Sequence, residues 1–411
     1  ARLGLTPAGE LLRGVVHETP LARSRTFSEL AGCDLALKLE NLQKTGSFKI
    51  RGAVNRIRLL TGEERSRGVI AASAGNHAQG VAWAATAAGI RSMIVMPAMA
   101  PLAKVQATQG YGADVVLRGA VYDEAMAHAR EIRDATGRTM IHPFDDDAVI
   151  AGQGTIGLEI LRQMPGVSTV VVPVGGGGLL AGVAAAIKEQ APGVRVVGVQ
   201  SEGAPAVWLS LRAGTLRTTP NALTMADGIA VKEPGARPFE LIRRYADDLV
   251  TVDDEETSST ILALLERSKQ MVEGAGAVSL AAVLHGKVAA EGQVACVISG
   301  GNIDVNVISR IIERGLVRAG RRVRMTTTLD DRPGALQRLL AVIAEERANV
   351  IQVIHDRVER DISFGQTFVE VCLETRDGRH ADDVWQALER EGYHVELISK
   401  KVTTGGGDYT G

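Results

Sequence analysis

Short runs of β-branched and apolar residues alternate with alanine-rich stretches along most of this chain of 411 residues. Each run is apolar throughout, which is typical of parallel strands that are covered on both faces of a sheet. The predicted strands are VIAAS (69–73), SMIVMP (92–97), STVVVPV (168–174), VRVVGVQ (194–200), DLVTV (248–252) and VACVIS (294–299). Stretches such as NHAQGVAWAATAAG and GLLAGVAAAIKEQ predict helices between them. This alternation of strands and helices predicts a doubly wound α/β fold.

The pattern changes near residue 320, where the basic, glycine-broken stretch GLVRAGRRVR predicts a linker. Six further elements follow it in the order strand, helix, strand, strand, helix, strand. They are VRMTTTL (323–329), ALQRLLAVIAEERA (335–348), VIQVIHDR (350–357), QTFVEVCLET (366–375), HADDVWQALEREG (380–392) and YHVELI (393–398). This βαββαβ order is that of a ferredoxin-like module. We therefore expect a larger part over residues 1–320, the module over 321–402, and a flexible tail, TTGGGDYTG, over 403–411.

The composition limits the classes of partner and of site. Lysine and arginine number 46 and aspartate and glutamate 48, so the net charge of −2 would attract neither nucleic acid nor an anionic membrane. No apolar run reaches the roughly 18 residues that a membrane-spanning helix needs. Cys33, Cys296 and Cys372 are far apart in sequence, which argues against disulfides or a cysteine metal site and favours a reducing compartment. We expect a cytoplasmic protein.

Four consecutive glycines lie between a predicted strand and a predicted helix in VPVGGGGLLAG (172–182). Consecutive glycines let backbone N–H groups turn towards an anion, and the N-terminus of the following helix adds its dipole. A tight turn would need fewer glycines, so a phosphate is the expected ligand. A dinucleotide is the alternative, because Gly176, Gly178 and Ala181 approach the G-x-G-x-x-A spacing, with Glu202 displaced from the place of the ribose carboxylate.

Two more loops place small polar residues between a strand and a helix. In ASAGNHAQG (72–80), Ser73, Asn76 and His77 stand beside backbone N–H groups that suit a carboxylate, although Ser73 and Asn76 are equally good helix caps. In VISGGNID, Ser299 ends a strand, where open α/β sheets bind ligands, and its alternative role is again a helix cap.

A single lysine, Lys49, follows Phe48 in GSFKIRGA (46–53). Lysines with apolar neighbours are usually surface residues whose stem is buried. The alternative is chemical, because partial burial lowers the pKa of a lysine and frees its amine to form a Schiff base. A phosphate-bearing aldehyde cofactor needs one such lysine, a phosphate site and a polar group at its ring nitrogen. Lys49 and the three loops together predict a cofactor of this kind.

Four segments, in their order along the chain, resemble the pyridoxal-phosphate enzymes of the tryptophan-synthase-β class (fold type II), and among these the threonine dehydratases. They are LENLQKTGSFKIRGA (39–53), SAGNHAQG (73–80), GGGGLLAG (175–182) and SGGNID (299–304). The resemblance covers about residues 1–320 and implies two open α/β subdomains, the smaller, at about 45–145, being inserted in the larger. The C-terminal module, with LDDRPGALQRLLAVI (329–343), resembles an ACT domain, a regulatory unit of amino-acid enzymes.

The resemblance implies roles for individual residues. Lys49 would form the Schiff base with pyridoxal 5′-phosphate and remove the α-proton of the substrate, Asn76 would bind the 3′-oxygen of the cofactor, and Ser299 its ring nitrogen. The implied cofactor-binding residues are Phe48, Lys49, Asn76, Gly175, Gly176, Gly177, Gly178, Leu179 and Ser299. The implied ligands of the substrate carboxylate are Ser73, Ala74, Gly75, Asn76 and His77.

The implied reaction is the dehydration and deamination of L-threonine to 2-oxobutanoate and ammonia, by α-proton abstraction and β-elimination. A neutral hydroxyl at the ring nitrogen makes the ring a poorer electron sink, which favours prompt loss of a β-leaving group. Ala74 replaces the serine that serves serine racemases as a second base, so we expect poor racemisation. Gln200 and Ala206 stand where some relatives carry carboxylates for a divalent cation, so we expect no divalent metal site; a monovalent ion held by carbonyls stays open.

Other activities remain open at this point. L-Serine or hydroxyaspartate dehydratase and a catabolic threonine ammonia-lyase are alternatives within the class. An amino-acid sensor on an inactive scaffold and a nucleotide-dependent dehydrogenase are alternatives outside it, and both leave Lys49 unexplained.

The ACT-like module predicts allosteric regulation. Its DRPG segment is Asp331, Arg332, Pro333 and Gly334, and Pro333 is expected to begin a helix whose free amides bind the carboxylate of an amino-acid effector. Isoleucine, opposed by valine, is the expected effector if the enzyme serves isoleucine biosynthesis. Paired modules imply a homo-oligomer, a dimer or a homotetramer. A purely structural dimerisation domain, and a catabolic role with another effector or none, are the alternatives.

Overall fold

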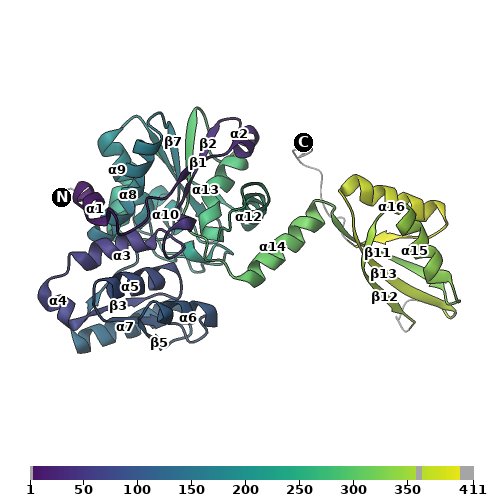
Figure 1. Ribbon diagram of the computed structural model, residues 1–411, viewed down its shortest axis with the longest axis horizontal. Helices are drawn as coiled ribbons and strands as arrows, with labels where there is room; N and C mark the ends of the chain where they lie inside the picture. The colour runs from purple at the N-terminus through teal and green to yellow at the C-terminus, as the bar shows by residue number, and fades with distance from the viewer. Residues whose placement is uncertain (1–2, 358–362, 399–411) are drawn as a thin grey trace. The chain divides into compact units, whose positions relative to one another are not determined.

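The computed structural model describes residues 3–357 and 363–398 (Figure 1), so the tail predicted at 403–411 lies outside the described residues. The chain divides into two compact units, Ala1–Ile303 and Asp304–Gly411. Within the described ranges, no helix is both long enough and apolar enough to span a membrane.

The described part of the N-terminal unit contains a six-stranded sheet in the order β1-β2-β10-β7-β8-β9. Its strands are β1 (Leu21–Arg23), β2 (Asp34–Leu39), β7 (Thr169–Pro173), β8 (Arg195–Ser201), β9 (Asp248–Val252) and β10 (Gln293–Ile298). All neighbours are parallel except β1, which pairs with β2 in the antiparallel direction at one edge. Because the central strands are apolar at nearly every position, both faces of this sheet are buried under helices.

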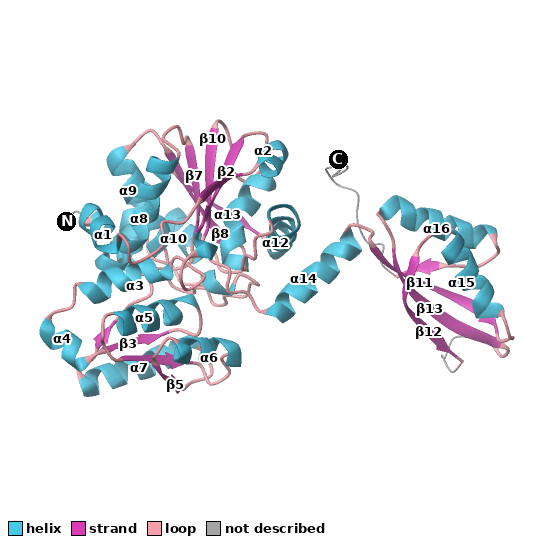
Figure 2. Cartoon of the chain, viewed as in Figure 1, coloured by secondary structure: helices cyan, strands magenta, loops and turns pink. Residues whose placement is uncertain are grey.

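Helices α8 and α9 cover one face of this sheet and α13 the other (Figure 2). Gly182 of α9 lies against α8 so closely that a Cβ there would come within 2.3 Å of the Ile150 carbonyl oxygen, which accounts for small residues on these helices. The helices of this larger lobe are α1 (Leu5–Leu12), α2 (Arg25–Ala31), α8 (Asp147–Gln163), α9 (Gly178–Gln190), α10 (Ala206–Ala213), α11 (Ala236–Tyr245), α12 (Asp254–Ser268) and α13 (Gly274–Leu284).

A second sheet, parallel throughout and in the order β5-β4-β3-β6, forms a smaller lobe inside the range 45–145. Its strands are β3 (Val69–Ala72), β4 (Ser92–Met96), β5 (Asp114–Leu117) and β6 (Thr139–Met140). Alternate residues of β3 enter two different cores: Val69 packs with α3 (Lys49–Arg58) and α5 (Asn76–Ala87), and Ile70 with α7 (Tyr122–Thr136). Helices α4 (Gly62–Arg67) and α6 (Leu102–Gly110) complete this lobe.

The C-terminal unit begins with α14 (Val305–Arg318) and contains an antiparallel sheet in the order β12-β13-β11-β14. Its elements follow the order β11 (Arg322–Asp330), α15 (Ala335–Glu345), β12 (Asn349–Asp356), β13 (Gln366–Glu374), α16 (Gly378–Arg390) and β14 (Glu396–Leu397). Leu339 of α15 and Val384 of α16 pack in one core with the same face of β11 and β13, so both helices cover one side of the sheet.

Three predictions about this unit differ from the structure. The stretch GLVRAGRRVR is not a linker, because α14 runs to Arg318, β11 begins at Arg322, and Gly320, with φ of 63°, ends the helix between them. The division between the units also lies before α14 instead of near residue 320. Pro333 does not begin a helix: α15 starts at Ala335, after Gly334 takes a left-handed conformation at its N-cap.

Candidate active site

Lys49 is the first residue of α3, and its side chain lies where the two lobes of the N-terminal unit meet. Its Nζ donates a hydrogen bond to the Pro143 carbonyl oxygen at 3.0 Å. The backbone N–H of Phe48 donates to the Ser299 carbonyl oxygen at 3.1 Å, and Ser47 forms a bridge with Gly300. The loop before Lys49 is therefore joined to the end of β10, as the predicted site requires.

The environment of Lys49 favours its neutral amine. Burial removes water from the ammonium and lowers its pKa to about 8, although the nearby Glu273 carboxyl opposes this shift. At neutral pH an appreciable fraction of an amine with this pKa is unprotonated. Only the unprotonated amine can attack a carbonyl group or accept a proton.

The four glycines adjoin the same segment that Lys49 contacts. A Cβ on Gly176 would lie 2.5 Å from the Phe144 ring, and one on Gly178 would lie 2.9 Å from the Phe144 carbonyl oxygen. Phe144 follows Pro143, so Lys49 and the glycine loop lie on either side of one short segment. Gly177 is the N-cap of α9 with φ of 98°, and no side chain caps this helix end. Its N–H groups are thus available to an anion.

Asn76 begins α5 and lies in a chain of side-chain hydrogen bonds. Its Nδ2 donates to Glu273 Oε1 at 2.6 Å, and its Oδ1 accepts from Asn302 Nδ2 at 2.7 Å. Glu273 in turn donates its backbone N–H to the Gly300 carbonyl oxygen at 3.1 Å. These contacts place Asn76 beside the Ser299 loop, although the two residues are more than 200 positions apart.

Glu273 was not among the residues predicted from the sequence. It is only 4% exposed, and burial raises the pKa of its carboxyl to about 7, with a further contribution from Asp227. The signal that points to it is a glutamate standing directly before α13, a helix of small and apolar residues. Burying a carboxylate at the start of a buried helix costs folding free energy unless a hydrogen-bond partner compensates for it, so such a carboxylate is a candidate for a functional role.

Ser299 is buried at the end of β10, and its hydroxyl donates to the Ala275 carbonyl oxygen at 3.1 Å. The next helix begins at Val305 and is capped by the Asp304 side chain. The alternative role of Ser299 as a helix cap is therefore wrong. A hydroxyl can donate or accept, so Ser299 suits the ring nitrogen that the resemblance assigns to it.

The 73–77 loop leaves the N-terminus of α5 without a side-chain cap. The Ser73 hydroxyl accepts the N–H of Gly75 at 3.2 Å, and Asn76 bonds Glu273 and Asn302, so neither is the cap of this helix. His77 contacts the Ile141 carbonyl oxygen through Nε2 at 2.8 Å, and burial, with Lys49 nearby, lowers its pKa to about 3. The buried Nδ1 of His77 has no hydrogen-bond partner and can accept a hydrogen bond. It lies beside the backbone N–H groups of the uncapped N-terminus of α5.

The other predicted residues lie at three further places. Leu179 is in the first turn of α9. Gln200 accepts the N–H of Trp208 at 2.8 Å and donates to the Ala204 carbonyl oxygen at 3.3 Å. The residues predicted to bind an effector, Asp331, Arg332, Pro333 and Gly334, belong to the C-terminal unit, where Asp331 is paired with Arg357 at 3.0 Å.

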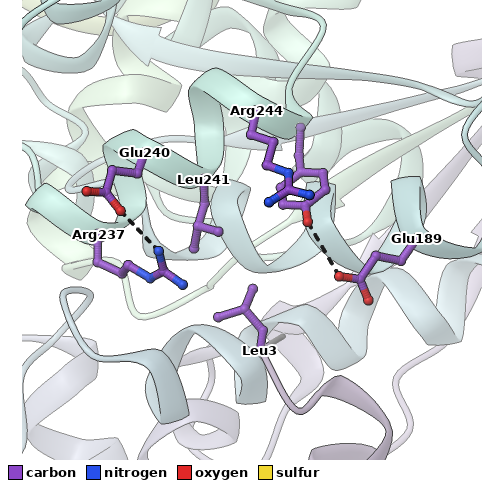
Figure 3. Close-up of a pocket in the computed structure, with 7 residues that line it drawn as sticks. Leu3, Glu189, Arg237, Glu240, Leu241 and Arg244 are labelled. Carbon is purple, nitrogen blue, oxygen red and sulfur yellow. Dashed lines mark hydrogen bonds and ion pairs between the residues drawn. The ribbon is translucent and has the colours of Figure 1, made fainter. Parts of the chain in front are cut away.

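One surface pocket of the N-terminal unit contains none of the predicted residues (Figure 3). Arg237 and Glu240 pair at 3.0 Å on one side of it, and Tyr245 faces Glu189 on the other. The lining is completed by Leu3, Leu241 and Arg244. The candidate site therefore rests on the contacts around Lys49 and not on this pocket.

Most of the chain is similar to known pyridoxal-phosphate-dependent enzymes. A model of the family described as pyridoxal-phosphate dependent enzyme matches residues 12–300. The chain is 53% identical to the L-threonine ammonia-lyase of Thermotoga maritima, over 95% of this chain and 98% of that protein. It is 46% identical to the catabolic L-threonine dehydratase of Escherichia coli K12, over 74% of this chain and 93% of that protein. The processed form of threonine deaminase isoform 2 from Solanum lycopersicum matches with a TM-score of 0.72 and 38% identity, over 76% of this chain and 86% of that one.

Proposed function

Because the chain belongs to the pyridoxal-phosphate-dependent enzymes, we propose that it dehydrates and deaminates L-threonine to 2-oxobutanoate and ammonia. The observation that carries the proposal is the convergence of Lys49, the glycine loop and the Asn76–Glu273 pair around Pro143, Phe144 and Gly300. The near full-length similarity to an L-threonine ammonia-lyase supports the choice of substrate.

The residues present fit pyridoxal phosphate. Lys49 supplies the amine, the uncapped N-terminus of α9 supplies donors for a phosphate, and the uncapped N-terminus of α5 supplies donors for a substrate carboxylate. Asn76 would bind the 3′-oxygen of the cofactor and Ser299 its ring nitrogen, as the resemblance implies. When bound, this cofactor stabilises negative charge at the α-carbon of an amino acid.

The protein's own groups then determine what happens to the α-proton. Lys49 Nζ, with a pKa near 8, takes the proton from the α-carbon and holds it. His77 stays neutral at any physiological pH, and Ala74 has no group that accepts a proton. Without a second base at position 74, elimination of the β-hydroxyl is favoured over racemisation. L-Serine, which carries the same leaving group, is the second candidate substrate.

We further propose that the C-terminal unit is an ACT-like regulatory domain and that regulation resides in about residues 321–402, with the reaction in 1–320. Its element order and its sheet order β12-β13-β11-β14 support a ferredoxin-like module. The family match ends at residue 300, before this unit, which supports a role separate from the reaction. Isoleucine bound at Asp331–Gly334, opposed by valine and acting within a cytoplasmic dimer or tetramer, is the expected regulation for isoleucine biosynthesis. A catabolic role with another effector is the alternative.

The catalytic proposal is tested with wild type, Lys49→Ala and the control Lys44→Ala, which removes an exposed lysine of the same loop. We expect the wild type to be yellow with bound cofactor and to release 2-oxobutanoate from L-threonine. Lys49→Ala should lose the visible band of the lysine-bound cofactor and at least about 1,000-fold in turnover, whereas Lys44→Ala keeps both. Full turnover by Lys49→Ala, or a wild type that stays inert with added pyridoxal phosphate, would contradict the proposal.

The regulatory proposal is tested by titrating isoleucine and then valine into the wild type and into Asp331→Ala. Inhibition by isoleucine that valine relieves, and that Asp331→Ala weakens, is the expected result. Inhibition that is equal in both proteins would move the effector site away from Asp331, and no inhibition would favour the catabolic alternative.

A further inference from the structure

Four charged side chains that the proposed reaction does not use are buried together beside α3. Lys38, Glu40 and Arg51 are 0% exposed and Glu159 is 8% exposed. Their charges balance, with two cations and two carboxylates. Buried charges are costly unless each is paired and hydrogen-bonded, so an arrangement of this kind needs a reason.

Arg51 is the centre of this cluster. Its Nε and Nη2 donate to the two oxygens of Glu40 at 2.8 and 2.7 Å, and its Nη1 and Nη2 donate to those of Glu159 at 2.6 and 2.9 Å. Nη1 also donates to Thr155 Oγ1 at 3.1 Å. Lys38 neutralises Glu159 from the other side, with Nζ at 2.5 Å. The planar guanidinium thus makes one bidentate ion pair with Glu40 and another with Glu159, and together these fix its orientation.

These contacts hold the first turn of α3 from the side opposite to Lys49. Arg51 follows Lys49 by two residues, and residues at this spacing leave a helix about 200° apart. Glu40 lies in η1 (Glu40–Leu42), directly after β2, and Glu159 lies in α8. Arg51 therefore joins α3 to two elements of the larger lobe. The N-cap of α3, Phe48, makes no side-chain cap, so no cap of its own holds this helix end.

We propose that Arg51 is a positioning residue: by joining α3 to Glu40 and Glu159, it sets the rotation and depth of the helix and so aims Lys49 Nζ at the reacting α-carbon. An apolar contact would allow α3 to slide or rotate slightly along its axis. The bidentate ion pairs are directional, so they fix the helix in one position. This inference rests on the proposed function, in which Lys49 is the base.

The inference predicts a change in the environment of Lys49 when Arg51 is altered. The ionisable groups that face Lys49 are Glu273, His77 and His142, and none of them contacts Arg51. If α3 shifts, water reaches the amine and its pKa rises from about 8 towards the value of a free lysine.

The test compares two variants. Arg51→Lys keeps the charge but loses the bidentate contacts, and Thr155→Val removes the hydroxyl that accepts one hydrogen bond from Arg51 Nη1. Ile187→Ala is the control, because it removes buried apolar atoms near the C-terminal end of α9 without touching α3. The first readout is the pH dependence of Lys49 acetylation in the full chain stripped of cofactor, followed by mass spectrometry of the Lys49 peptide. The second is kcat and KM for L-threonine in the cofactor-loaded protein.

Arg51→Lys should raise the pH midpoint of Lys49 acetylation by about one pH unit and lower kcat about 100-fold, with KM changed less than about threefold. Thr155→Val should shift both quantities in the same direction by less, and Ile187→Ala should lower only the melting temperature. A wild-type midpoint and kcat in Arg51→Lys, or the same shifts in Ile187→Ala, would overturn the inference. If Arg51→Lys does not fold, wild-type values in Thr155→Val would overturn it.

The two proposals fail in different ways. A wild type that releases no 2-oxobutanoate refutes the proposed reaction. The acetylation midpoint still reports whether Arg51 holds Lys49, because it needs neither substrate nor turnover.

Discussion

Replacing Glu273 by glutamine should stabilise the cofactor-free protein, and by more as the pH rises. Glu273 is 4% exposed, and burial raises the pKa of its carboxyl from 4.5 to about 7. Between these two values the folded state binds a proton that the unfolded state has released, so the free energy of unfolding falls as the pH rises. A difference of about 2.5 pH units, at about 1.4 kcal/mol each, corresponds to about 3–4 kcal/mol.

Glutamine keeps the oxygen that accepts from Asn76 Nδ2 and has no charge to desolvate. The advantage of Glu273→Gln over the wild type should therefore grow from near zero below pH 4.5 to about 3–4 kcal/mol above pH 7, where the carboxyl is charged in both states.

The assay is urea unfolding of both cofactor-free proteins from pH 5 to 8.5, followed by tryptophan fluorescence. Trp83 and Trp208 of the N-terminal unit contribute to this signal, and Trp385 of the C-terminal unit adds the same background in both proteins. Glu202→Gln, at an exposed position, controls for the loss of one carboxylate from the chain. A stability difference between Glu273→Gln and wild type that is the same at pH 5 and pH 8 would refute the argument that burial shifts this carboxyl.

Three further perturbations test other parts of the structure. Gly176→Ala places a Cβ 2.5 Å from the Phe144 ring and should lower the affinity for pyridoxal phosphate by at least about tenfold in an absorbance titration. Gly193→Ala, where nothing lies within 4 Å, is its control, and equal affinities in the two variants would contradict the expected clash. The imidazole of His77, whose pKa is lowered to about 3 by burial, should show no NMR titration between pH 5 and 8; a midpoint near 6.5 would contradict its burial. Leu339→Ala removes a fully buried side chain and should destabilise the C-terminal unit by about 2–5 kcal/mol, seen as faster hydrogen exchange in β11 and β13. The same change should leave exchange in β7 and β10 unaltered, and loss of protection there would mean that the two units do not unfold separately.

Local sequence was sufficient to predict six strands of the N-terminal unit, β3, β4, β7, β8, β9 and β10, to within one or two residues, whereas β1, β2, β5 and β6 were not predicted. The runs at 69–73, 92–97 and 248–252 match β3, β4 and β9, because an apolar run between turn residues has few alternatives to a buried strand. Predictions at the junction of the two units were poorer. Two glycines and several arginines at 315–324 suggested a linker, but the helix α14 includes Gly315 and ends only before Gly320.

The candidate site divides in the same way. Local composition made Lys49, Asn76, Ser299 and the glycine loop candidates, and the family resemblance assigned their roles. Glu273 was missed, because its carboxyl becomes unusual only once Asn76 and the Ser299 loop close over it.

The sequence by itself determined where most of the strands and helices form and which residue types stand at the strand ends, because periodicity and turn preference act over a few neighbouring residues. The tertiary structure decided that β10 lies between β2 and β7, and so joins Ser299 to Phe48 across the chain. It also decided that Lys49 is desolvated and that Arg51 is paired with Glu40 and Glu159. Desolvation and charge pairing depend on which distant segments exclude water from a side chain, and only the folded chain brings those segments together.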